Sequence, residues 1–272
     1  MQVRLDKFLA DAGIGTRSEV KSIIKRKAVT INGICAAKPE IKITPDEDEI
    51  AVNGTLVTMR GSVTYLLHKP AGYVCAVKDD RFPTVMEFVP QSRDLFPVGR
   101  LDKDTEGLLL ITNDGGMAHR MLSPRSHVDK TYLAVLDRPA ERAYADLFSA
   151  GVEIGDDTPT LPAGFVICGE DSRECEYLPE EYRADSGSGR VVLLTIQEGR
   201  YHQVKRMFHA VGNEVIYLKR LSFGALVLPT SLKKGEAICV EMPPMGLRPH
   251  FFKVPEKENI DDLKVNIEAL KF

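Results

Sequence analysis

The stretch PVGRLDKDTEGLLLITNDG, residues 97–115, decides how this chain folds. Its first half gathers charged side chains into a short polar loop, and its second half, GLLLIT at 107–112, is too apolar to face solvent on both sides. A short apolar run bounded by Gly, Asn and Asp is typical of a buried β-strand. We therefore expect the polar loop to be held at the end of a buried strand, where Arg100, Asp102, Lys103, Asp104 and Glu106 lie close together.

Three interpretations of this loop follow from the residues alone. Calcium binding is one, because Asp102, Asp104, Glu106 and Gly107 match the first half of an EF-hand loop, but Leu110 and Asn113 stand where the second half needs ligands. A pair of carboxylates for acid-base chemistry on a sugar is the second, using Asp102 with Asp104 or Glu106. The third is a purely structural turn, in which Arg100 pairs with a neighbouring carboxylate and Asp and Thr side chains bond the local backbone.

Outward from this loop, residues 63–250 alternate predicted strands and helices. The strands are expected at 65–69, 107–112, 131–136, 191–197 and 214–220, and the helices at 115–122, 139–151 and 201–212. This pattern predicts one α+β domain with a mixed, largely antiparallel sheet. Residues 170–190 are acidic and poor in apolar side chains, which predicts a surface insertion. The extension at 251–272 has apolar residues at helical spacing and is expected to form an amphipathic helix.

Residues 1–60 are predicted to form a separate small domain with two short helices and a few short strands. Residues 1–42 contain nine basic and four acidic side chains, a local balance of +5. Ser18 is expected to cap the second helix, and VTING at 29–33 reads as a strand entering a turn. The basic side chains are spaced so that they share one exposed side, which is either a solvated helix face or a surface for nucleic-acid phosphates; they are Arg17, Lys21, Lys25 and Lys27.

Two resemblances favour the second interpretation. The segment RLDKFLADAGIGTRSEVKSIIKRKAVTINGICA at 4–36 resembles an S4-type RNA-binding domain. The block from Gly99 to Gly115 resembles the central motif of the RsuA-type rRNA pseudouridine synthases, and KPAGYVC at 69–75, DKTYLAVL at 129–136 and EGRYHQVKRMFHAVGNEVIYLKRLSFG at 198–224 match the same family in the same order. The resemblance implies an S4-like domain followed by an α+β catalytic domain of the pseudouridine synthase fold.

The same resemblance implies which residues carry the chemistry. Asp102 is the catalytic carboxylate, Tyr132 stacks on the uracil, and Lys205 is the cation that keeps Asp102 ionised. Taken alone, Tyr132 reads as a strand aromatic and Lys205 as a helix-surface lysine. RNA contacts are expected from Arg17, Lys21, Lys25, Lys27, Arg100, Arg200, His202 and Arg206. The isomerisation loses no atom and requires no cofactor and no metal.

Composition sets the remaining expectations. The chain has 272 residues, a formal net charge of −3, five scattered cysteines without a Cys-x-x-Cys pair, and no run of about 18 apolar residues, so we expect a cytoplasmic protein away from the membrane. The expected substrate is a specific uridine of small-subunit 16S rRNA, of the uridine-516 type, presented within a small-subunit assembly intermediate to a monomeric enzyme. The alternatives are a 23S rRNA enzyme of the same family and a non-catalytic RNA-binding protein of ribosome assembly.

Overall fold

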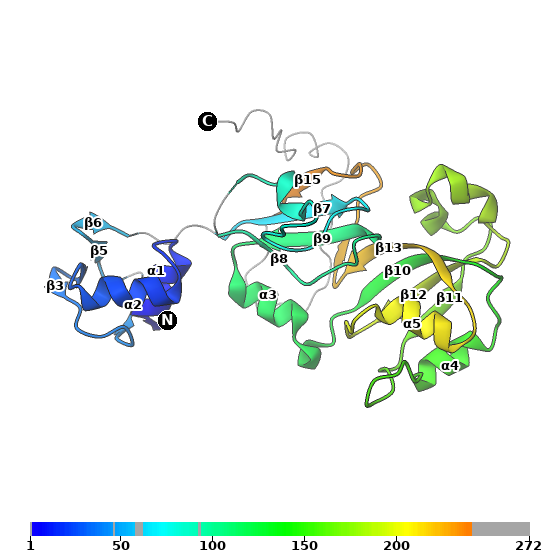
Figure 1. Cartoon of the computed structure of the whole chain (residues 1–272), viewed down its shortest axis with the longest axis horizontal. Helices are drawn as coiled ribbons and strands as arrows, with labels where there is room; N and C mark the ends of the chain where they lie inside the picture. Colours follow the sequence, from blue (N-terminus) through cyan, green and yellow to red (C-terminus); the bar gives the residue numbers. More distant parts are fainter. Residues whose placement is uncertain (1, 46, 58–61, 92–93, 241–272) are drawn as a thin grey trace. The chain divides into compact units, whose positions relative to one another are not determined.

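The computed structural model describes residues 2–45, 47–57, 62–91 and 94–240, and Figure 1 traces them. The chain divides into two compact units, one formed by residues 1–63 with 92–94 and the other by residues 64–91 with 95–272. The helix expected at 251–272 lies outside the described residues. In the described ranges, no helix is both long enough and apolar enough to cross a membrane.

The N-terminal unit packs two helices beside short antiparallel strands. Helix α2 begins with a reciprocal cap, in which the Glu19 backbone N–H donates to Thr16 Oγ1 (3.3 Å) and the Thr16 N–H donates to the Glu19 carboxylate (2.7 Å). The cap is therefore Thr16 and not Ser18, because Glu19 stands three residues after Thr16 and completes the pair. The elements are β1 (Val3–Arg4), α1 (Leu5–Asp11), α2 (Arg17–Lys25), β2 (Val29–Ile31), β3 (Ile34–Cys35), β4 (Lys42–Ile43), β5 (Ile50–Val52) and β6 (Thr55–Leu56).

A common apolar core holds these N-terminal elements together. Phe8 and Leu9 of α1, Val20 and Ile24 of α2, and Val29 of β2 are all buried in it. The faces left outside carry the basic residues, and Arg17, Lys21 and Lys25 follow one another at intervals of four along α2. One side of this helix is thus apolar and packed, and the opposite side is cationic and solvated.

The second unit is built on a nine-stranded sheet in the order β11-β12-β10-β13-β9-β7-β15, with β14 beside β13 and β8 beside β9. Neighbouring strands run antiparallel except β13 and β9, which are parallel and share two register pairs, Lys219 with Glu106 and Arg220 with Gly107. The strands are β7 (Thr64–Lys69), β8 (Phe96–Pro97), β9 (Glu106–Thr112), β10 (Lys130–Leu136), β11 (Gly164–Ile167), β12 (Val191–Ile196), β13 (Val215–Phe223), β14 (Leu226–Val227) and β15 (Ala237–Cys239). The predicted α+β fold with a mixed, largely antiparallel sheet is confirmed, and each of the five predicted strands is present.

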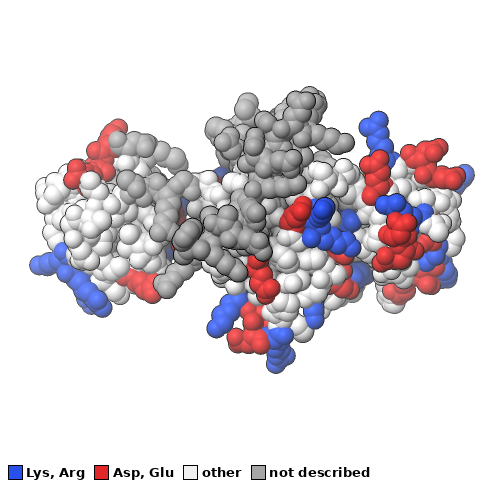
Figure 2. All heavy atoms as spheres, turned by 90° about the horizontal axis from the view of Figure 1, so that it is seen from above, with Lys and Arg blue, Asp and Glu red and all other residues white. Residues whose placement is uncertain are grey.

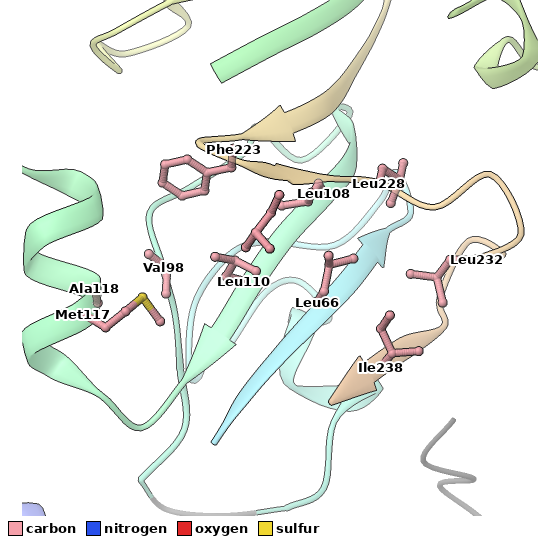
Figure 3. Close-up of a cluster of buried hydrophobic side chains, with 11 residues drawn as sticks. Leu66, Val98, Leu108, Leu110, Met117, Ala118, Phe223, Leu228, Leu232 and Ile238 are labelled. Atoms are coloured by element: carbon pink, nitrogen blue, oxygen red, sulfur yellow. The ribbon is translucent and has the colours of Figure 1, made fainter. Parts of the chain in front are cut away.

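The strand predicted from GLLLIT lies in the middle of a core cluster. Leu108 and Leu110 of β9 lie on the same face of the sheet as Leu66 of β7, and Figure 3 shows Met117 of α3 (Gly115–Leu122) next to Val98 in the same cluster. Leu109 and Ile111, on the other face of β9, have no exposed surface either, which explains why this segment is apolar without the alternation of a half-exposed strand. Asp114 caps α3 by accepting the Met117 N–H (2.8 Å), so the chain turns from strand into helix within two residues.

Two helices differ from their predicted bounds. Helix α4 spans Tyr144–Ala150 and begins five residues after Pro139, because residues 141–143 form a turn before it. Helix α5 spans Gln203–Ala210, and His202 before it has the left-handed backbone conformation (φ 47°), which excludes Tyr201 and His202 from the helix. Short 3-10 turns complete the unit: η1 (Val85–Phe88), η2 (Pro124–Ser126), η3 (Arg173–Tyr177) and η4 (Glu180–Asp185).

The predicted surface insertion at 170–190 is more firmly packed than its composition indicates. Leu178 is buried in a cluster with Leu133, Val135 and Val191 of the sheet, and the Tyr182 ring lies 5.3 Å from that of Tyr217. The Tyr177 carbonyl accepts a hydrogen bond from the buried Lys219 ammonium (2.6 Å). A few aromatic and aliphatic side chains among many acidic ones are thus enough to fix this segment against the sheet.

Candidate active site

A pocket opens where the polar loop 99–105 meets strands β10, β12 and β13 and the start of α5. Asp102 and Arg100 line it from the loop, Tyr132 from β10, and His202 from the segment before α5. These residues are up to 102 positions apart in the sequence, and the sheet brings them together. The pocket therefore unites side chains from three of the motifs that the sequence singles out.

The loop that carries Asp102 is fixed from beneath by a buried lysine. Lys69, the last residue of β7, has no exposed surface, and its ammonium donates to the carbonyl oxygens of Pro70 (3.1 Å), Asp102 (3.1 Å), Lys103 (3.3 Å) and Thr105 (2.8 Å). Burial lowers the pKa of Lys69, while nearby carboxylates act in the opposite direction. Three of the four acceptors belong to the loop, so this one cation determines the path of its backbone.

Two further residues, Cys75 and Gly72, hold the same loop through three hydrogen bonds. The Cys75 thiol donates to the Leu101 carbonyl (3.5 Å) and accepts the Leu101 N–H (3.3 Å), and the Gly72 N–H donates to the Lys103 carbonyl (2.7 Å). Burial raises the pKa of the Cys75 thiol, which keeps it in the neutral form that can donate. Asp102 is thus presented from a backbone bonded on both sides, which suits a group that must meet a substrate in one orientation.

Two cationic or potentially cationic groups lie close to the Asp102 carboxylate. His202 Nε2 is 3.6 Å from Oδ1, and Lys205 Nζ is 3.8 Å from Oδ2. Both separations are longer than a hydrogen bond, so neither group donates to the carboxylate, and Lys205 attracts it through charge alone. The carboxylate itself is about a quarter exposed (26%) and opens to the pocket.

The closest partner of Lys205 is Asp104 rather than Asp102. Lys205 Nζ lies 2.7 Å from each oxygen of the Asp104 carboxylate. Desolvation, the largest influence, raises the pKa of Asp104, but the Lys205 ammonium outweighs it and the net pKa is lowered. Lys205 therefore lies between two carboxylates, and its contact with Asp104 holds it beside Asp102.

Glu106 does not take part in this arrangement. Its carboxylate accepts from the Tyr217 hydroxyl (2.7 Å) and is paired with the Lys234 ammonium (2.8 Å). Because Glu106 is held by a different cation from Asp104, the three acidic side chains of the loop do not converge on one point, and the described residues contain no group of three side chains placed to hold a metal ion. Asp102 is the loop carboxylate that lines the pocket.

Tyr132 is almost fully buried (7% exposed) in the wall of the pocket. It lies in register with Leu194 of β12 and Arg220 of β13. Arg220 is buried and its Nε donates to the Leu108 carbonyl of β9 (2.8 Å). This bond crosses from β13 to β9 beside Gly107, where any side chain would collide, since a Cβ there would lie 2.2 Å from the Arg220 carbonyl oxygen.

The residues predicted to bind RNA fall into three groups. Arg17, Lys21, Lys25 and Lys27 are exposed on the N-terminal unit, and Arg100 is exposed at the pocket. Arg200 donates instead to the carbonyls of Thr158 (2.6 Å) and Pro159 (2.7 Å) and to Glu198 (2.9 Å), and Arg206 donates to the carbonyls of Ile154 and Tyr201. RNA contact by all of these residues stays a prediction, and in this structure the guanidinium groups of the two arginines hold the loop at 154–159.

Three notable residues escaped assignment from the sequence. Lys69 stands in a buried strand, where a lysine is rare unless its charge has partners, and that position is the signal that could have found it. Asp104 lies two residues after Asp102, but spacing alone does not say which cation it meets. Tyr201 is the third: it is largely exposed and its ring stacks on His202.

Comparison with known proteins agrees with this geometry. Residues 63–210 match the family model described as RNA pseudouridylate synthase, and residues 3–50 match that of the S4 domain. The chain belongs to the RNA pseudouridylate synthase family and carries an N-terminal S4 RNA-binding domain. It is an RNA pseudouridine synthase, an isomerase.

Among its relatives, the uncharacterized RNA pseudouridine synthase YtzG of Bacillus subtilis is 42% identical over 86% of this chain and 93% of that protein. The ribosomal small subunit pseudouridine synthases A of Pasteurella multocida and Escherichia coli are 40% and 38% identical, each over 86% of this chain and 94% of the relative. A solved structure described as a pseudouridylate synthase is 38% identical, with a TM-score of 0.59, and the match covers 88% of this chain and 96% of that one.

Proposed function

We propose that this protein converts a specific uridine of small-subunit 16S rRNA to pseudouridine, with Asp102 as the catalytic carboxylate. The observation that carries the catalytic assignment is the position of Asp102, on a loop bonded from both sides, in a pocket walled by Tyr132 and flanked by Lys205. The 16S target rests on the relatives named ribosomal small subunit pseudouridine synthase A, which are similar over 86% of the chain. YtzG, at 42% identity, is uncharacterized, so identity alone does not choose the target.

The reaction breaks the bond between N1 of uracil and C1′ of ribose, rotates the base, and joins C5 to C1′. C5 loses a proton and N1 gains one, so the product is an isomer of the substrate. Asp102 acts at the sugar, either by bonding to C1′ or by stabilising the charge that develops there when the N1 bond breaks. Because neither His202 nor Lys205 donates a hydrogen bond to it, its oxygens are free to approach the sugar.

Lys205 stabilises the negative charge of the Asp102 carboxylate. At 3.8 Å, a unit charge pair contributes about 1 to 4 kcal/mol for dielectric constants between about 80 and 20. Tyr132, which lines the pocket, supplies the flat wall against which the detached uracil turns, and its phenol assists removal of the C5 proton. Arg100, exposed at the pocket mouth, takes the space that the flipped uridine leaves in the RNA.

The test maps pseudouridine in rRNA after incubation with the protein. Unmodified 16S and 23S rRNA, naked and assembled with ribosomal proteins, are treated with wild type, Asp102→Ala and Asp146→Ala, and carbodiimide-dependent stops of reverse transcription locate the product. Asp146 is an exposed carboxylate on α4 and serves as the matched control. We expect one new stop in 16S rRNA with wild type and Asp146→Ala, and none with Asp102→Ala, which still binds RNA.

Each alternative has a distinct outcome. A stop in 23S rRNA alone would assign the protein to the large subunit. No stop in any RNA with a folded wild type would point to a non-catalytic role in ribosome assembly. Conversion by Asp102→Ala would remove the catalytic assignment, and loss of RNA binding in that variant would give Asp102 a binding role instead.

A further inference from the structure

Tyr201 is an aromatic side chain left largely in solvent next to the pocket. Tyr201 is 76% exposed, so most of its ring does not pack against the rest of the protein. Its ring stacks nearly parallel on the ring of His202, with centroids 3.9 Å apart and planes inclined by 17°. His202 lines the pocket, and its Nε2 is 3.6 Å from the Asp102 carboxylate. The two rings therefore form a stack that begins beside Asp102 and ends in an exposed aromatic face.

The backbone under this stack is firmly held. His202 has the left-handed conformation (φ 47°, ψ 33°), which is uncommon for a bulky side chain and persists only where surrounding contacts impose it. Arg206 donates to the Tyr201 carbonyl (3.0 Å) and its own N–H donates to the His202 carbonyl (3.0 Å), while the Arg200 N–H donates to the Gln203 side chain (2.9 Å). An aromatic ring on such a backbone loses little freedom when a flat partner binds.

The arginines closest to Tyr201 in the chain are already bonded within the protein. On the face seen from above in Figure 2, Lys and Arg atoms are intermixed with Asp and Glu atoms over the right-hand part of the larger unit. Arg200 donates hydrogen bonds to the Thr158 and Pro159 carbonyls, and Arg206 donates to the Ile154 carbonyl. A flat apolar contact is thus the interaction that Tyr201 itself provides.

We propose that Tyr201 is a stacking platform for the RNA base next to the target uridine. When a uridine leaves the RNA stack to enter the pocket, its neighbour loses the surface that it covered, and an aromatic side chain replaces that surface for any of the four bases. The His202 ring lies between Tyr201 and Asp102. A base stacked on Tyr201 is therefore a neighbour of the target uridine and not the uracil that reacts at Asp102. This inference rests on the proposed function of the pocket.

A double-mutant cycle tests the platform. The substrate identified by pseudouridine mapping is prepared with an abasic ribose immediately 5′ or 3′ of the target uridine, and kcat/KM is measured with wild type and Tyr201→Ala. We expect Tyr201→Ala to lower kcat/KM on the intact substrate about 10- to 100-fold, the effect of losing one base–aromatic stack. One of the two abasic substrates should lose a similar factor with wild type and little more with Tyr201→Ala, because the two changes remove the same contact.

Two further variants separate stacking from other roles. Tyr201→Phe keeps the ring and should recover the activity that Tyr201→Ala loses. Val166→Ala removes an exposed apolar side chain from β11 and should match wild type. Since Tyr201 is exposed, Tyr201→Ala should unfold at the wild-type temperature.

The outcomes distinguish the platform from the function on which it rests. Equal kcat/KM for wild type and Tyr201→Ala overturns the platform alone, as do losses that multiply across the cycle on both abasic substrates, or a Tyr201→Phe variant as slow as Tyr201→Ala. A wild type that leaves every uridine unchanged overturns the proposed function, and the platform with it.

Discussion

Lys69→Met removes the cation under the Asp102 loop while nearly preserving side-chain volume. Two effects oppose each other. Met relieves the cost of burying a charge, which is visible in the lowered pKa of Lys69. It also takes away the donor for four carbonyl groups, three of them in the loop. Whether Lys69→Met raises or lowers the free energy of unfolding depends on how many of these carbonyl groups accept a hydrogen bond from another donor.

The hydrogen-bond partners allow that count. The Asp102 carbonyl also accepts the Thr105 N–H (3.1 Å), and the Lys103 carbonyl also accepts the Gly72 N–H (2.7 Å), so both retain a partner. If the Pro70 and Thr105 carbonyls go unpaired, the cost is about 2 to 6 kcal/mol, and relief of the buried charge recovers part of it. We expect a net loss of about 3 kcal/mol, equivalent to a fall in Tm of about 6 to 12 °C for a domain of this size. Displacement of Asp102 by about 1 Å would lower kcat about 100-fold.

Thermal unfolding and single-turnover conversion measure the two effects. Lys130→Met is the matched control, because Lys130 is also buried with a lowered pKa, but its ammonium donates to one carbonyl, that of Val128 (2.9 Å), outside the loop. It should lose less stability and keep its kcat. A Lys69→Met variant with wild-type Tm and kcat, or a Lys130→Met variant equally impaired in both, would refute the reasoning that the loop depends on Lys69.

Three further predictions follow from buried groups. Thr105→Val should raise the unfolding free energy by about 1 kcal/mol in urea denaturation, because the buried Thr105 hydroxyl has no hydrogen-bond partner among the described residues, and a loss of stability would contradict this. Burial lowers the pKa of Lys219 to about 8, so between about pH 8 and its ordinary value of 10.5 the unfolded chain holds a proton that the folded protein lacks. The unfolding free energy of wild type minus that of Lys219→Met should therefore rise from pH 7 to pH 10, and a flat or falling difference would disprove the assignment. Burial raises the pKa of Cys168 to about 12, so iodoacetamide at pH 8 should label exposed Cys35 long before Cys168 in peptide mass mapping; equal rates would show that Cys168 is not protected.

The sequence predicts which segments form strands and helices better than it predicts the contacts between their side chains. The run 107–112 is apolar because β9 is covered on both sides, and local composition carries that information. The start of α5 is different: His202 has a left-handed conformation, and a turn closed by the bond from the Gln203 N–H to the Arg200 carbonyl precedes the helix. Helical spacing of apolar residues reports which face of a helix is buried, and it does not report this turn.

The site divides in the same way. Asp102, Tyr132 and His202 were identified through motif blocks, and the structure brings them into one pocket. The preference of Lys205 for Asp104 depends on how helix α5 meets a loop that lies 101 residues earlier in the sequence. The anchoring of 170–190 likewise depends on where Leu178 and Tyr182 meet the sheet, although composition alone describes that stretch as solvated.

The two parallel register pairs between β9 and β13 divide the catalytic unit into halves. Asp102 precedes β9 on one half, while Tyr132 and Lys205 belong to β10 and α5 on the other. Their spacing is therefore set by the approach of these two strands together with the contact of Lys205 with Asp104. The absence of a side chain at Gly107 permits this approach, because even a methyl group there would lie 2.2 Å from the Arg220 carbonyl oxygen. A substitution at Gly107 would thus push apart the two sides of the pocket without touching any residue that lines it.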